Sequence, residues 1–134
     1  MASVYHLPVA DGSVDLLVDC FAPLALEEYR RVLKPGGTFL YVVPAARHLM
    51  ELKAVLYDSP YPNQEEAVPY AGFDYVGIVP VTAVMEIRDR DSLSALFHMT
   101  PYAWKTPKEG VDRLARLDGL DVTIDFRIHV FRKQ

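Results

Sequence analysis

Two apolar runs in the first third of the chain, residues 14–19 and 38–43, have the length of β-strands. Between them, residues 24–33 repeat apolar side chains at helical spacing, and Pro35 followed by two glycines ends that helix. The run 38–43 lacks polar alternation, which is typical of a strand buried on both faces in a parallel sheet. The pattern predicts a strand–helix–strand crossover, which places ligand-binding groups at the carboxyl ends of its strands.

The remaining elements follow from the same two periodicities. Residues 73–87 are rich in β-branched side chains, and residues 121–132 alternate strictly between apolar and polar. The alternation predicts a half-solvated strand antiparallel to its neighbours. Helices are predicted at residues 47–57, after Asp91 as N-cap, and after a capping box at residues 106–109. We expect an α/β fold, with helices packed on a mixed sheet.

Composition narrows the function classes. With a single cysteine in 134 residues, a disulfide framework and a cysteine-based zinc cluster are excluded, and we expect no metal. The formal net charge of −4 argues against nucleic-acid binding by charge alone, although Arg30, Arg31, Arg47 and Lys53 concentrate basic charge in the first half. Without a membrane-length apolar run or a signal pattern, we expect a cytoplasmic protein that does not bind membranes.

Groups with useful chemistry follow the predicted strand ends. Asp19 and Phe21 lie in the loop after the first run, where an aromatic ring either stacks on an unpaired base or fills the core. Arg47, His48 and Glu51 begin the next helix, and the spacing of His48 and Glu51 puts them on one helix face. These residues form a candidate site for substrate contact.

Three further segments carry expectations of their own. Tyr102 and Trp104 share a compact turn and either stack on a base or form a hydrophobic plug. Residues 58–70, with three prolines, are too long for a simple connection and are expected to be mobile. Residues 1–6 are short and β-prone, and predict a short strand that Leu7-Pro8 ends.

Particular strings resemble known proteins. Leu-Lys-Pro-Gly-Gly at residues 33–37, after a strand that ends in an acidic and aromatic loop, is similar to class I S-adenosylmethionine-dependent methyltransferases. The more restrictive strings at residues 44–53 and 99–104, together with the ending at residues 123–131, resemble the family of ribosomal RNA large-subunit guanine-N1 methyltransferases. The resemblance runs from residue 2 to the C-terminus.

The resemblance implies a reaction and its participants. The methyl group of S-adenosylmethionine would pass directly to guanine N1 of ribosomal RNA, and a proton acceptor is wanted there. Asp19, His48 and Glu51 have suitable chemistry, and the choice among them stays open. In the family, the positions of Ser3, Leu7 and Phe21 lie near the cofactor. Substrate contacts are expected, in addition, from the side chains already singled out, namely Phe21, Arg47, His48, Tyr102 and Trp104.

Parts of the family's pattern do not occur in this sequence. The chain has no Gly-x-Gly turn for the cofactor and no cysteine cluster of a zinc module. We therefore expect residues 1–134 to be the C-terminal part of one methyltransferase domain, without the first strands, in a truncated, split or fragment form that is inactive alone. The missing first strand would leave the strand at residues 14–19 at an open sheet edge, which predicts a homodimer or pairing with a missing N-terminal half. Two alternatives stay open, a non-catalytic homodimeric or partner-binding remnant, and a methyltransferase half acting on a small molecule.

Overall fold

A computed structural model describes residues 2–63 and 69–134, and this part of the chain forms two compact units. We call residues 2–44, 69–81 and 126–134 the sheet unit, and residues 45–63 and 82–125 the helical unit. Each unit is described by itself, and the single domain expected over the whole chain stays a prediction.

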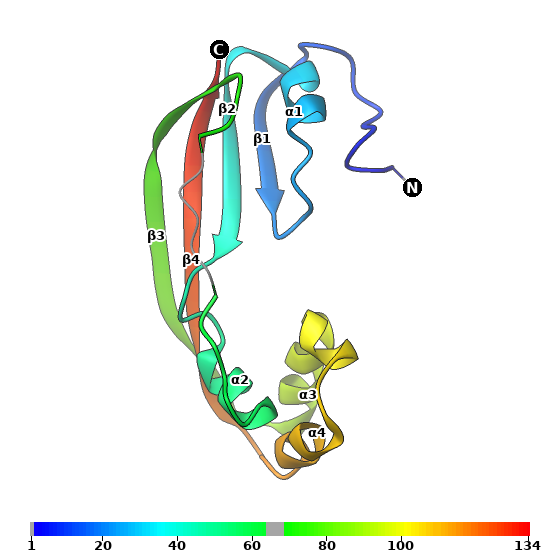
Figure 1. Ribbon diagram of the computed structural model, residues 1–134, viewed down its shortest axis with the longest axis vertical. Helices are drawn as coiled ribbons and strands as arrows, with labels where there is room; N and C mark the ends of the chain where they lie inside the picture. Colours follow the sequence, from blue (N-terminus) through cyan, green and yellow to red (C-terminus); the bar gives the residue numbers. More distant parts are fainter. Residues whose placement is uncertain (1, 64–68) are drawn as a thin grey trace. The chain divides into compact units, whose positions relative to one another are not determined.

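Strands and helices alternate up to β3, and three helical elements then precede the last strand (Figure 1). They are β1 (Val14–Cys20), α1 (Leu26–Val32), β2 (Leu33–Pro44), α2 (Met50–Leu56), β3 (Phe73–Ile87), α3 (Arg90–Met99), the 3-10 helix η1 (Pro101–Trp104), α4 (Lys108–Ala115) and β4 (Leu120–Lys133). The strands form one mixed sheet in the order β1-β2-β4-β3. This confirms the predicted α/β fold.

The centre of the sheet has the predicted crossover. β1 and β2 are parallel, with Val18 opposite Leu40, and α1 connects them. β4 pairs antiparallel with β2, with Val130 opposite Leu40. The predicted positions of residues 14–19, 38–43 and 121–132 in one sheet are therefore confirmed, and β1 lies at an open edge of it.

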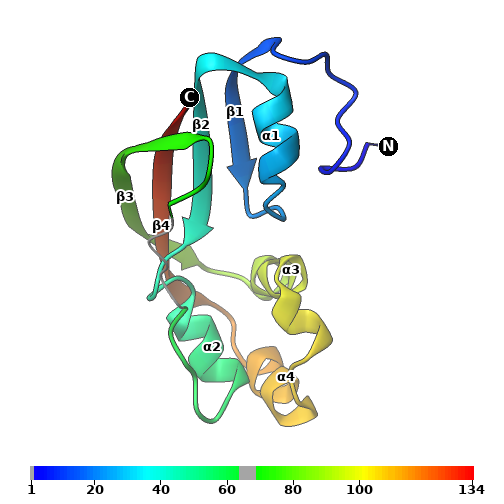
Figure 2. The same ribbon diagram turned by 45° about the horizontal axis from the view of Figure 1, so that its top comes forward.

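The core of the sheet unit lies on the face that α1 covers (Figure 2). Tyr29 and Leu33 are buried there, and aromatic rings from three strands surround them. The Phe39 ring centroid lies 5.5 Å from those of both Phe73 and Phe131. Each such ring contributes about 1.5–3 kcal/mol on burial, so this cluster is the main stabilising feature of the unit.

The opposite face of β1 is open, which differs from the doubly buried strands that we expected. Leu16 and Val18 are each 54% exposed, and the neighbouring Leu40 and Val42 of β2 are half-buried. The apolar composition of these strands fits a parallel sheet with both faces covered. In the described chain, a helix covers only one of them.

β4 is not the half-solvated strand that the alternation predicted. Asp125 is only 4% exposed and His129 only 8% exposed. β4 lies between β2 and β3, so its side chains meet neighbours on both sides. Partners satisfy the buried polar groups: the Thr82 hydroxyl donates to Asp125, and the Tyr75 hydroxyl lies 3.1 Å from His129 Nδ1.

The helical unit is built around a separate apolar core. Side chains from its three α-helices and from β4 are buried together, and they include Leu52, Leu56, Leu93, Leu114 and Val122. The predicted inner stripe of α2 is confirmed, although α2 begins at Met50 rather than at residue 47.

Both predicted caps in the helical unit are wrong. Asp89, rather than Asp91, caps α3 by accepting a hydrogen bond from the Ser92 backbone N–H at 2.7 Å. α4 begins after Pro107 without a side-chain cap. The Thr106 hydroxyl, expected in a capping box, donates to the Tyr102 carbonyl instead.

Two expectations concern less regular segments. The predicted short strand at residues 1–6 is replaced by an isolated bridge between Ser3 and His6. The loop expected to be mobile includes residues 64–68, which lie outside the described residues. Within residues 2–63 and 69–134, none of the helices is long and apolar enough to cross a membrane.

Gly110 gives a test of the packing between α2 and α4. A Cβ at this position would overlap the backbone carbonyl of Leu56, whereas one at Gly77 of β3 would meet open space. We predict that Gly110→Ala lowers the free energy of unfolding by roughly 1–3 kcal/mol through overpacking, although helix propensity alone would raise it by about 1 kcal/mol. Thermal and denaturant unfolding measure the change. Gly77→Ala is the control, and an unchanged or more stable Gly110→Ala variant would contradict the packing.

Candidate functional site

Asp19 ends β1 and organises the loop that follows it. One carboxylate oxygen accepts a hydrogen bond from the Tyr29 hydroxyl at 2.6 Å, and the other accepts one from the Ala22 backbone N–H at 3.0 Å. Burial, together with the bond to the Asp19 carboxylate, raises the pKa of Tyr29. Tyr29 therefore stays protonated and keeps donating, which fixes the strand end to α1.

Phe21 occupies this loop in an unusual backbone conformation. Its φ is +57°, a left-handed value that costs a non-glycine residue about 1–2 kcal/mol. Its backbone N–H donates to the Val42 carbonyl, and its ring meets Phe126 edge-on at 5.2 Å. The ring is nevertheless 52% exposed. Strain of this kind concentrates at functional sites, and the role of Phe21 near a cofactor or a base stays a prediction.

Ser3 and Leu7 lie in the N-terminal segment, which α1 holds through side chains. The Leu7 N–H donates to the Glu28 carboxylate at 2.8 Å, and the Leu7 carbonyl accepts from Arg31. The hydrogen bond from Arg31, and then that from the Leu7 backbone, lower the pKa of Glu28 to about 2. The Ser3 hydroxyl accepts from the Tyr5 N–H.

These residues do not by themselves fit the whole of S-adenosylmethionine. The backbone polar groups of Leu7 are engaged with α1, and Ser3 is exposed. The chain has no glycine-rich turn for the ribose and amino-acid moieties.

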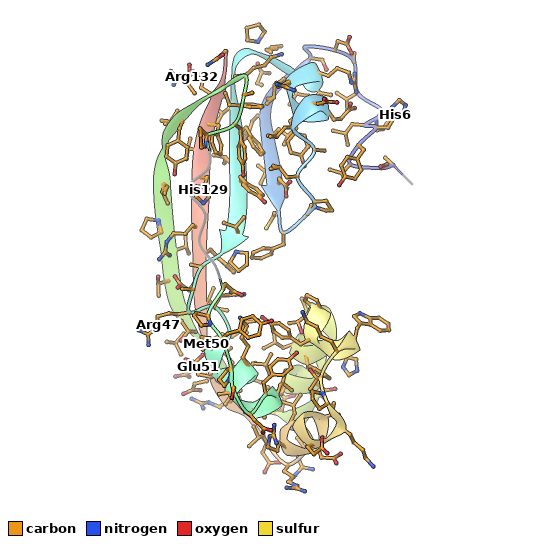
Figure 3. All side chains as sticks on the ribbon, in the orientation of Figure 1. His6, Arg47, Met50, Glu51, His129 and Arg132 are labelled. Carbon is orange, nitrogen blue, oxygen red and sulfur yellow. The ribbon has the colours of Figure 1, made fainter. Side chains whose placement is uncertain are left out.

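A second set of predicted site residues meets at the start of α2, in the helical unit. Glu51 accepts hydrogen bonds from both the backbone N–H and the hydroxyl of Thr123, at 2.9 and 2.5 Å. His48 Nδ1 accepts one from the Asp125 N–H at 3.2 Å, and the Arg47 N–H donates to the Asp125 carboxylate. Figure 3 shows Arg47 and Glu51 projecting from this region. The spacing predicted that His48 and Glu51 lie on one helix face, but His48 precedes α2, and the two residues come together because both bind β4.

The protonation states of this set follow from its surroundings. Burial, with a smaller contribution from the nearby Lys53, lowers the pKa of His48, which is neutral at pH 7. Because Nδ1 accepts a hydrogen bond, the imidazole proton is on Nε2. Burial alone would raise the pKa of Glu51, but the hydrogen bonds from Thr123 outweigh it and the pKa is lowered. A neutral imidazole and a carboxylate at the start of α2 are thus both bonded to β4.

The two aromatic residues of η1 differ in their surroundings. Tyr102 packs against the core of the helical unit and meets Tyr57 edge-on at 6.1 Å. Trp104 is 92% exposed. Each residue therefore fits one of the two interpretations of this turn. Tyr102 fills part of the hydrophobic core, and the ring of Trp104 is accessible to a ligand.

The predicted basic surface does not form as expected. Lys53 is buried, at 2% exposure, where its ammonium contacts Asn63 and the Tyr61 carbonyl. Arg30 donates to the Ala71 carbonyl, and Arg31 is paired with Glu28 and Asp11. Sequence reasoning missed the buried lysine because the aromatic rings around it come from separate segments.

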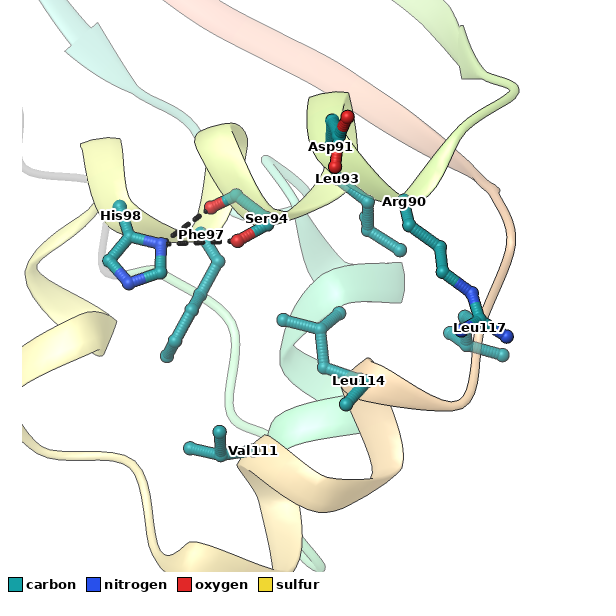
Figure 4. Close-up of a pocket in the computed structure, with 10 residues that line it drawn as sticks. Arg90, Asp91, Leu93, Ser94, Phe97, His98, Val111, Leu114 and Leu117 are labelled. Atoms are coloured by element: carbon teal, nitrogen blue, oxygen red, sulfur yellow. Dashed lines mark hydrogen bonds between the residues drawn. The ribbon is translucent and has the colours of Figure 1, made fainter.

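The helical unit also has a hollow of about 300 Å³ between α3 and α4 (Figure 4). Its walls are mainly apolar, and His98 at one side is bonded through Nδ1 to the Ser94 carbonyl at 2.8 Å. The predicted site residues do not line it. Its lining includes Leu93, Phe97, Val111, Leu114 and Leu117.

Comparison with solved structures defines the class of fold. A protein of Anaeromyxobacter dehalogenans described as a type II methyltransferase matches 92% of this chain and 66% of its own, with a TM-score of 0.57 and 19% identity. A protein of Bacillus halodurans C-125 described as a methyltransferase matches 98% of this chain and 69% of its own, with a TM-score of 0.54 and 15% identity. The chain has a partial class I methyltransferase fold, as predicted.

Comparison with curated proteins identifies the relatives. YxjB of Bacillus subtilis, assigned by its name to the 23S rRNA (guanine-N(1)-)-methyltransferases, is 31% identical over 99% of this chain. The 23S rRNA (guanine(748)-N(1))-methyltransferase of Streptomyces fradiae is 33% identical over 94% of it. No family model matches the chain.

The chain is thus a homologue of 23S rRNA guanine-N1 methyltransferases, which confirms the resemblance seen in the sequence motifs. It spans about half the length of the curated relatives it matches, 49% and 47% respectively.

The left-handed backbone at Phe21 gives a prediction about stability. Phe21→Gly and Phe21→Ala both remove the ring, but only glycine adopts a φ of +57° without a Cβ penalty. We predict that the glycine variant is the more stable of the two by about 1 kcal/mol in denaturant unfolding. At Tyr75, which lies in the regular strand β3, the same pair of substitutions should show the reverse order. An alanine variant at position 21 that equals or exceeds the glycine variant would refute the strain.

Proposed function

We propose that this chain supplies the substrate-side part of a methyltransferase that transfers a methyl group from S-adenosylmethionine to N1 of a guanine in 23S rRNA. The observation that carries the proposal is the identity of 31% and 33%, over nearly the whole chain, to relatives named for that reaction. The mixed sheet, with β4 antiparallel beside a parallel pair, supports it.

The reaction requires a proton acceptor as well as a methyl donor. Neutral guanine carries a proton on N1, which must leave as the new N–C bond forms. We propose that one of Asp19, His48 and Glu51 does this work, and the carboxylates of Asp19 and Glu51 are favoured because His48 Nδ1 already accepts the Asp125 N–H and its Nε2 carries the proton. Both carboxylates already accept hydrogen bonds within the chain, yet each of their oxygens has a second lone pair for a guanine N–H.

Substrate contacts are proposed for residues in both units. Phe21, strained and half-exposed at a strand end, offers its ring to the target base in the sheet unit. In the helical unit, Arg47 has an exposed side chain that suits a phosphate, and Trp104 an exposed ring that suits a base. His48, next to Arg47, is bonded to β4 through the Asp125 N–H. Tyr102 packs against the core of the helical unit and so positions the turn that carries Trp104.

A chimera tests the proposed reaction. The stretch of the Streptomyces fradiae relative that matches this chain would be replaced by this chain, and 23S rRNA would be incubated with the product and the methyl donor. We predict methyl transfer to one guanine, detected as a stop of reverse transcription, because N1 methylation blocks the base-pairing edge. A folded chimera that transfers no methyl group would count against the proposal, and the unmatched part of the relative alone is the control.

The second control is the chain by itself, for which we propose no useful cofactor affinity. Its sequence lacks the glycine-rich turn, so the ligand's ribose and amino-acid groups would lose several partners at about 1–3 kcal/mol each. Because about 1.4 kcal/mol is tenfold in affinity, a micromolar site would weaken to about millimolar. Calorimetry with S-adenosylmethionine measures this, and micromolar binding by the chain alone would disprove it.

A non-catalytic homodimer is the second candidate, and the open face of β1 favours it. Leu16 and Val18 lie exposed on an edge strand, and such an edge pairs readily with another chain.

We predict that Val18→Glu converts such a dimer to monomer in light scattering. The control is Val76→Glu, an equally exposed valine of β3, at 56% against 54%, which should leave the dimer intact. A wild-type chain that is monomeric at high concentration excludes the homodimer.

A further inference from the structure

Trp104 lies in a hydrogen-bonded turn and yet is exposed. The carbonyl of Tyr102, two residues earlier, accepts hydrogen bonds from the Lys105 and Thr106 backbone N–H groups and from the Thr106 hydroxyl. The Thr106 hydroxyl also lies 3.2 Å from the Tyr57 hydroxyl. The turn is therefore fixed from its buried side while the indole, 92% exposed, faces solvent. A single exposed ring is common on protein surfaces, but a ring with further exposed aromatic groups beside it is typical of a binding surface.

A buried cation brings a second exposed ring into the same neighbourhood. The Lys53 ammonium lies 5.4 Å from the ring centroid of Tyr61 and 5.6 Å from that of Tyr102. It also donates to the Asn63 side chain at 2.8 Å and to the Tyr61 carbonyl. Lys53 thereby fixes Tyr61, whose ring is largely exposed, beside the turn that carries Trp104.

The charge at this place is positive. Lys105, exposed next to Trp104, is close enough to Lys53 to lower its pKa, after the larger effect of burial. Within residues 2–63 and 69–134, neither lysine forms an ion pair with a carboxylate. Two cations beside two open aromatic rings match the chemistry of a base with its phosphate.

We propose that Trp104 and Tyr61, with Lys105, form a site for an unpaired nucleobase and the adjoining phosphate of single-stranded RNA. Trp104 stacks on the base, Tyr61 borders it, Lys105 pairs with the phosphate, and Lys53 is a positioning residue. The inference rests on the proposed function, because it concerns the RNA substrate. It adds a site in the helical unit that needs neither the cofactor nor the target guanine.

The chain has a built-in reporter for this site. Trp104 is the single tryptophan, so emission excited at its absorption edge comes from this residue alone. The probe is an unstructured RNA heptamer, added to the 134-residue chain, with the same strand in a duplex for comparison. We expect saturable quenching by the single strand and binding at least about tenfold weaker for the duplex, whose bases are already stacked.

Matched variants assign the contacts. Tyr61→Ala should weaken binding about tenfold, while Tyr5→Ala, which removes a tyrosine of the same exposure (62% against 63%), should not change it. Lys105→Glu should weaken binding and reduce the salt slope by about 0.7, the value for one phosphate contact on a single strand. Lys34→Glu in the sheet unit is its control. Lys53→Met should weaken quenching, and Lys53→Arg should restore it.

Several outcomes would overturn the site. One is Trp104 emission that does not change when single-stranded RNA is added. Another is equal quenching by the single strand and the duplex, and a third is a Tyr61→Ala variant that binds the single strand as tightly as wild type. A blue shift of Trp104 with rising protein concentration, without RNA, would show that a second copy covers the ring instead. If the chimera transfers methyl groups and the Trp104 emission does not respond to RNA, this site is refuted and the proposed function stands. If the Trp104 emission responds and the chimera transfers no methyl group, the site stands and the proposed function is refuted.

Discussion

β4 is the strand on which both units depend. In the sheet unit its Phe131 packs against Phe39, and in the helical unit its Val122 is buried among the helices. Backbone N–H groups of Thr123 and Asp125, between these two points, are bonded to side chains of the α2 segment. Because a buried backbone donor without a partner is costly, these bonds tie α2 to one register of β4.

The crossover was predictable because it is local. The helix of residues 26–32 and the two strands beside it are consecutive, and their periodicity and the Lys-Pro-Gly-Gly string encode them directly. The burial of Asp125 was not predictable in the same way. It depends on Thr82 of β3 and on the Arg47 backbone, far away in the sequence, which satisfy its carboxylate. The alternation of apolar and polar residues reflects only the sequence of one strand, whereas the strands and loops beside it determine which of its side chains are buried.

The candidate site was predictable by position and not by conformation. Asp19 and Phe21 were found because they follow a strand end, but the positive φ of Phe21 leaves no mark in its sequence. The capping box failed for a related reason, since the Thr106 hydroxyl had a nearer acceptor in the Tyr102 carbonyl. Lys53 was expected on the surface because lysine usually lies there, whereas two tyrosine rings and an asparagine from separate segments stabilise it inside.

The use of basic side chains explains how an acidic chain could recognise RNA. Arg31 pairs with acidic groups, Lys133 binds the carbonyls of Arg30 and Leu33 at the end of α1, and Arg113 binds that of Val55. These cations stabilise the fold and are therefore not available as a basic patch. With a net charge of −4, the chain gains little from long-range attraction to phosphates. Most of the affinity for RNA must then come from contacts that salt does not screen, and stacking on an exposed aromatic ring is such a contact. The exposed ring of Trp104 meets this requirement.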